Sequence, residues 1–127
     1  MPKNRSISIA VRATNERTAD VLEKQLGLQM KKNDILQVFS KQEPLFMKMN
    51  KVFKWSIDAG KEISIVIDAD ILVRKGLLNV IRENFTALKK TDAGFGIQLF
   101  DRFFHRPKFR GIFVYKASVL PLFYENY

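Results

Sequence analysis

The sequence predicts an α/β fold in which helices flank a mainly parallel sheet. Short runs rich in β-branched residues alternate with helical patterns through about residue 90, and such alternation is typical of parallel sheets. The run at 63–67 (ISIVI) has Ser64 as its only polar residue, which indicates a strand buried on both faces. With 127 residues and neither an internal repeat nor a linker, the chain is expected to form one domain, residues 1–127.

Strands and helices are expected in a regular order along the chain. The expected strands span residues 7–11, 34–39, 63–67, 95–100 and 112–115. The expected helices span residues 18–26, 44–59 and 72–85. Gly27 and Gly60 follow the first two helices as typical stop residues, and Pro44 suits the first turn of the second. The third helix is expected because its Leu, Val, Ile and Phe residues keep a near-helical spacing.

Composition excludes several classes of protein. The chain has no Cys and one His, so a disulfide framework, a thiolate nucleophile and a His-rich zinc site are excluded. It shows neither a signal peptide nor the ~20 consecutive apolar residues of a transmembrane span, so the expected location is the cytoplasm, with peripheral attachment to a membrane as an alternative. The net charge of +9 suits a nucleic acid, an anionic membrane surface or a polyphosphate ligand. Scattered lysines are nevertheless more often a solvated surface.

Two acids, Asp68 and Asp70, follow the buried run at 63–67. Residues i and i+2 of a strand point to the same side, and ligands of parallel sheets bind beyond the carboxyl ends of the strands. Two carboxylates without a neighbouring His or Cys suit a hard cation, Mg²⁺ or Mn²⁺, that shares oxygens with phosphates. The alternative is that Asp70 caps the helix expected near Leu72, while Asp68 is solvated at the strand end.

The segment Ser64–Ile71 (SIVIDADI) resembles the metal-binding strand of GT-A glycosyltransferases, most closely the large inverting family 2, where it reads like ILFLDADI. The similarity covers nearly the whole chain in order, and this strand is its specific part. Supporting segments are Arg12–Asn15, Ala59–Glu62, Gly76–Leu78 and Gly111–Lys116. The resemblance implies the nucleotide-sugar-binding half of such an enzyme.

The resemblance also implies roles for individual residues. Asp70 would bind the Mn²⁺ or Mg²⁺ ion that holds the diphosphate, and Asp68 would contact the ribose or reach the metal through water. Thr14 and Asn15 would border the base. Glu43 is the one acid able to replace the family's base- or ribose-binding acid after the second strand. An active protein of this kind would transfer a hexosyl group in a metal-dependent reaction.

The sequence does not decide whether the chain is an enzyme. The family's general base lies beyond the segment Gly111–Lys116, and the chain is expected to lack that acceptor and base region, so no catalytic base is assigned. The apolar, aromatic tail from Val119 to Tyr127 predicts packing on a second copy or a partner chain.

Two other functions are compatible with parts of the sequence. A phosphoacceptor receiver domain would suit the length and an Asp after a central strand, but the acid pair expected after its first strand is missing. A nucleic-acid module would use the interleaved basic and aromatic residues of Arg102–Arg110, although the Phe residues there also suit a core. A nucleotide-diphosphate sugar is therefore the favoured partner and a nucleic acid the less favoured one.

Overall fold

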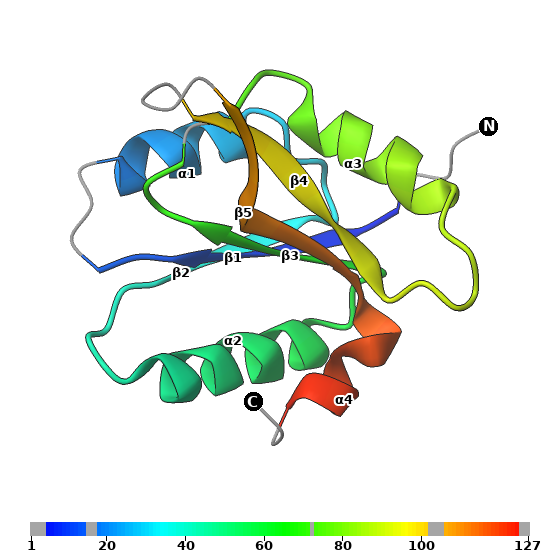
Figure 1. The fold of residues 1–127 in the computed structure, drawn as a ribbon. Coiled ribbons are helices and arrows are strands. Elements are labelled where there is room, and N and C mark those ends of the chain that lie inside the picture. Colours follow the sequence, from blue (N-terminus) through cyan, green and yellow to red (C-terminus); the bar gives the residue numbers. More distant parts are fainter. Residues whose placement is uncertain (1–4, 15–17, 72, 102–105, 125–127) are drawn as a thin grey trace.

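The computed structural model describes residues 5–14, 18–71, 73–101 and 106–124. Its described part contains a five-stranded sheet in the order β2-β1-β3-β5-β4 with helices on both faces (Figure 1). The elements are β1 (Ile7–Arg12), α1 (Ala19–Gly27), β2 (Ile35–Phe39), α2 (Leu45–Ala59), β3 (Ile63–Asp68), α3 (Leu77–Thr86), β4 (Gly94–Asp101), β5 (Arg106–Lys116), the 3₁₀ turn η1 (Ala117–Val119) and α4 (Leu120–Phe123). The α/β class predicted from the sequence is confirmed.

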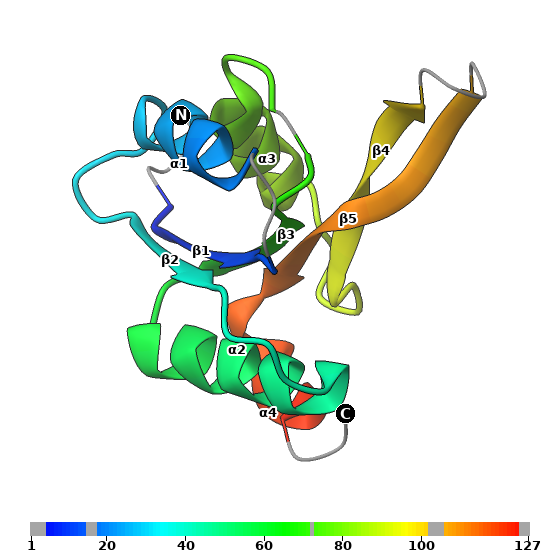
Figure 2. The same ribbon diagram turned by 90° about the vertical axis from the view of Figure 1, so that its left-hand side faces the viewer.

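The sheet is mixed, so a mainly parallel sheet is not confirmed. β1 pairs in parallel with β2 and β3, whereas β5 pairs antiparallel with both β3 and β4. The strand–helix alternation stops after α3, and β4 and β5 follow one another as an antiparallel pair with β5 inserted beside β3. Figure 2 shows β4 and β5 extending together away from the rest of the sheet.

Two apolar cores lie on opposite faces of the sheet, since side chains alternate along a strand. Alternate residues of β1 and β3, such as Ile9 and Ile65, pack with α1 and α3 in the first core. Ala10 and Val66 face the other way and pack with α2 and α4 in the second core. The first five residues of β3, Ile63–Ile67, are all buried, which confirms the prediction of a strand covered on both faces.

The order of the strands places a topological switch point between β1 and β3. The chain passes from β1 through α1 to β2 on one side, and then through α2 to β3 on the other side of β1. The two crossovers use opposite faces of the sheet (Figures 1 and 2). In open α/β sheets a ligand binds in the crevice outside the carboxyl ends of the strands at such a point.

Helix α3 begins at Leu77, five residues later than the predicted Leu72, which itself lies outside the described residues. The residues before it form a non-helical connection, in which Ala69 and Val73 are buried in the core. Gly76, with a φ of 86°, precedes the helix. The predicted start of this helix was therefore wrong.

The aromatic tail packs partly within the chain. Leu120 is fully buried against α2, and the ring centroids of Phe53 and Phe123 are 5.7 Å apart. Leu122 is exposed, while Tyr127 lies outside the described residues. The expected homodimer or partner contact through this tail stays a prediction. Among the described residues, no helix is both long and apolar enough to cross a membrane.

Candidate functional site at the carboxyl ends of β1 and β3

Asp68 and Asp70 lie at the switch point between β1 and β3. Asp68 is the last residue of β3 and stands in register with Arg12, the last residue of β1. The ladder continues past them, because the Ala69 N–H donates to the Arg12 carbonyl oxygen at 2.9 Å. The Thr18 hydroxyl donates to the Ala69 carbonyl oxygen, so the residue between the two acids is held from two sides.

The Arg12 guanidinium binds the Asp68 carboxylate. Nε and Nη2 of Arg12 both donate to Oδ1 of Asp68, at 2.8 Å and 2.5 Å. The side chains are 20% and 34% exposed, so the pair is partly shielded from water. Arg12 therefore neutralises Asp68 and occupies one of its oxygens. From the sequence, Arg12 was expected only to belong to the supporting segment Arg12–Asn15, and this role was missed.

Asp70 is different, because its side chain is exposed and makes no hydrogen bond or ion pair with the described residues. It does not cap α3 either, since that helix has Gly76 at its N-cap and no side-chain cap. The expected alternative of a capping Asp70 is wrong. The two acids thus differ: Arg12 holds the carboxylate of Asp68, and none of the described side chains holds that of Asp70.

A second basic side chain lies at the end of β1. Lys48 of α2 is only 6% exposed, and its Nζ donates to the Ala13 carbonyl oxygen at 2.9 Å. The next residue of the helix, Met49, accepts from Nη1 of Arg12 through its sulfur at 3.1 Å. Helix α2 therefore brings a buried ammonium and a contact to Arg12 to the same edge of the sheet.

The other predicted site residues are distributed along this edge. Thr14 is exposed and follows Arg12 by two residues, as Asp70 follows Asp68. Glu43 lies in the connection between β2 and α2, where it pairs with Lys51 at 2.7 Å. Asn15 lies outside the described residues.

Strand β5 passes close to the acid pair at Gly111. The residue has a φ of 81°, and a Cβ there would lie 2.2 Å from Cδ1 of Ile71 and 3.3 Å from Oδ2 of Asp68. Only glycine fits this left-handed position beside another chain segment without strain. The glycine thus lets β5 cover one side of the turn that holds Asp68.

We expect Gly111→Ala to lower the free energy of unfolding by about 1–3 kcal/mol, because a methyl group adds backbone strain and displaces Ile71. Urea denaturation measures this change. Gly27→Ala is the matched control, since a Cβ at Gly27 meets nothing within 4 Å. An equal stability of the two variants would contradict the close approach of β5.

Among the described residues, no group of three or more His, Cys, Asp or Glu side chains could hold a metal ion. At this end of the sheet, the described residues therefore offer a cation no carboxylates beyond the Asp68–Asp70 pair. That number of carboxylates suits Mg²⁺ or Mn²⁺ if water and phosphate oxygens complete the coordination.

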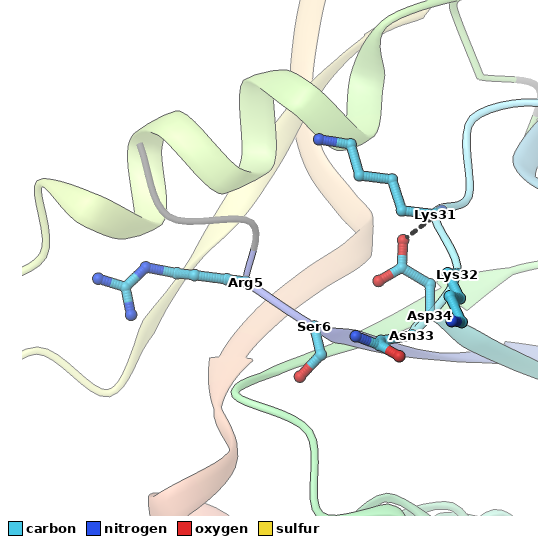
Figure 3. Close-up of a pocket in the computed structure, with 6 residues that line it drawn as sticks. All are labelled: Arg5, Ser6, Lys31, Lys32, Asn33 and Asp34. Atoms are coloured by element: carbon cyan, nitrogen blue, oxygen red, sulfur yellow. Dashed lines mark hydrogen bonds between the residues drawn. The ribbon is translucent and has the colours of Figure 1, made fainter. Parts of the chain in front are cut away.

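A hollow of about 120 Å³ lies at the opposite edge, beside the amino ends of β1 and β2. It is lined by Arg5, Ser6, Lys31, Lys32, Asn33 and Asp34 (Figure 3). The side chains of Lys31 and Lys32 extend in different directions and do not converge (Figure 3). Its volume is well below the ~300–1,000 Å³ typical of small-molecule sites, so it is a weaker candidate for a ligand site than the switch point.

No family model and no curated protein sequence matches the chain. Among solved structures, the chain is similar to the crystal structure of A197 from STIV, with a TM-score of 0.62 and 9% sequence identity. The similarity covers 92% of this chain and 67% of that one. At this identity the likeness shows a shared fold and nothing about function.

Proposed function

We propose that the chain is a GT-A-like domain that binds a nucleotide-diphosphate sugar through a divalent cation at the carboxyl ends of β1 and β3. The observation that best supports this proposal is the exposed carboxylate of Asp70 at the topological switch point, which has no partner among the described residues. The expected residue pair and the expected edge of the sheet coincide there, while Arg12 fixes the neighbouring Asp68.

The two acids would then have separate tasks. Asp70 would bind the cation directly, and the cation would neutralise the diphosphate. Asp68 keeps Oδ2 for a hydroxyl of the ribose or a water of the cation, because Arg12 occupies only Oδ1. In glycosyl transfer, the cation would stabilise the departing diphosphate as negative charge develops on it. No described acid is assigned as the base that deprotonates an acceptor.

The alternatives receive less support. Flavodoxin-like folds, which receiver domains share, order their strands 2-1-3-4-5. The sheet here is ordered β2-β1-β3-β5-β4 with β5 antiparallel. The basic and aromatic cluster that a nucleic acid would use, Arg102–Arg110, lies where the structure describes no side chains, so this alternative stays a prediction.

Asp70→Asn should abolish the part of nucleotide-diphosphate binding that depends on Mn²⁺. An amide keeps the shape of the side chain but removes the charge that attracts the cation. Calorimetric titration of a panel of nucleoside diphosphates, with and without Mn²⁺, measures this. Because Asp70 is exposed, the free energy of unfolding should change by less than about 0.5 kcal/mol.

Asp58→Asn is the matched control, because it removes the same charge from an exposed position on α2. It should bind nucleotide and Mn²⁺ as the parent does. The proposal fails if Asp70→Asn retains Mn²⁺-dependent binding, or if the parent shows none with any member of the panel.

A further inference from the structure

Lys48 is a buried lysine that has no acidic partner in the part of the chain that the structure describes. Only 6% of the residue is exposed, and its Nζ donates one hydrogen bond, to the Ala13 carbonyl oxygen. An ammonium has three donors, so two of them have no partner among the described residues. No carboxylate in the described part of the chain forms a salt bridge with it.

The other lysines of α2 show the opposite arrangement. Lys51 pairs with Glu43 at 2.7 Å, and Lys54 pairs with Asp58 at 3.7 Å. Both of these lysine side chains are about half exposed or more, where a partner matters little. Among the described residues, the most buried of the three lysines is therefore the one without a counter-charge. A buried charge is costly unless it is paired, so a bound anion would stabilise Lys48.

The position of Lys48 indicates what it could bind. The Ala13 N–H donates to the Phe39 carbonyl oxygen at 2.9 Å, so Ala13 marks the carboxyl ends of both β1 and β2. Thr14, the next residue, is exposed, so the carbonyl that holds the ammonium lies one residue from the surface. Arg12 precedes Ala13 and contacts Met49, which places a second cationic group at the same strand end.

We propose that Lys48 binds phosphate directly. Its ammonium would donate its remaining hydrogen bonds to oxygens of a phosphate or diphosphate group at the end of β1. The inference rests on the proposed function for the identity of the ligand, a nucleoside diphosphate. It adds that part of the affinity for the diphosphate does not require a divalent cation. A phosphate oxygen supplies both the missing negative charge and the missing acceptors.

Lys48→Met tests this, because Met has a similar length without the charge. The probe is inorganic pyrophosphate in buffer containing EDTA, titrated by calorimetry at low and moderate salt. The parent should bind pyrophosphate, and Lys48→Met should bind it about tenfold or more weakly, since a charge-assisted contact is lost. Lys54→Met is the matched control on the same helix and should stay within about twofold of the parent.

Thermal unfolding distinguishes a Lys48 that binds phosphate from one that only connects α2 to the end of β1. Pyrophosphate should raise the melting temperature of the parent and of Lys54→Met, and should leave that of Lys48→Met unchanged. Lys48→Arg keeps the charge and should retain most of the binding. Weaker binding by Lys48→Met alone would then result from the missing charge and not from misfolding. The inference is overturned if the parent does not bind pyrophosphate saturably, or if Lys48→Met binds it as Lys54→Met does.

The test of the phosphate contact at Lys48 is independent of the test of the cation site at Asp70. Asp70→Asn should still bind pyrophosphate in EDTA, because Asp70 acts only through the metal. A parent that binds pyrophosphate in EDTA but shows no Mn²⁺-dependent binding of nucleotide would therefore refute the proposed cation site alone. Intact Mn²⁺ dependence with equal pyrophosphate binding by Lys48→Met would refute the phosphate contact alone.

Discussion

Replacing Arg82 with Met should lower the free energy of unfolding by about 3–5 kcal/mol, because it leaves a buried carboxylate without its counter-ion. The side chains of Arg82 and Asp34 are 4% and 1% exposed, and Nη2 of Arg82 donates to Oδ2 of Asp34. The backbone N–H groups of Ile7 and Lys31 donate to the same carboxylate at 2.9 Å and 2.8 Å. This cluster therefore joins α3 to the starts of β1 and β2.

Urea denaturation of the parent and the variant measures the loss. The matched control is Lys54→Met, which breaks a pair whose two side chains are more than half exposed and should cost less than about 1 kcal/mol. Adding Asp34→Asn to Arg82→Met should recover part of the stability, because the uncompensated charge is removed. If Arg82→Met cost no more than Lys54→Met, the pair would not contribute to the stability of the fold.

Strand positions could be predicted from the sequence because uninterrupted runs of β-branched residues are typical of buried strands. The run Ile63–Ile67 was expected to be covered on both faces and is. The pairing of the last two strands could not be predicted, since antiparallel insertion of β5 beside β3 depends on contacts between distant segments. The start of α3 was misplaced for a related reason. Val73 lies within the predicted helix 72–85, but it packs in the core from a non-helical connection, and an apolar residue in the sequence does not distinguish the two.

The two acids were visible in the sequence, but their different roles were not. Asp68 and Asp70 look equivalent in a motif, and they differ because Arg12 lies 56 residues earlier and in register with Asp68. Only the parallel pairing of β1 with β3 brings that guanidinium to one acid and not to the other. Lys48 left a clearer signal, since it lies four residues before Val52, within the apolar stripe of α2. A charged residue inside such a stripe is unusual enough to suggest a function.

Arg12→Met should tighten the binding of Mn²⁺ alone by about five- to thirtyfold, the largest gain expected at the site. The substitution removes a positive charge a few ångström from the proposed cation, an effect of about 1–2 kcal/mol at a partly exposed position. It also frees Oδ1 of Asp68, which both Nε and Nη2 of Arg12 occupy. Titration calorimetry with Mn²⁺ in the absence of nucleotide measures the change.

The double variants Arg12→Met/Asp68→Asn and Arg12→Met/Asp70→Asn identify the source of any gain. If the cation uses both carboxylates once Arg12 is gone, either second substitution should bring the affinity back to the parent's level or below it. If Asp70 alone binds the cation, Asp68→Asn should leave a gain due only to the lost repulsion. An Arg12→Met variant that binds Mn²⁺ no better than the parent would contradict a cation at this end of the sheet. In the parent, Arg12 would then serve only to hold Asp68 in place, and the affinity for a diphosphate would depend on cationic side chains rather than on a metal.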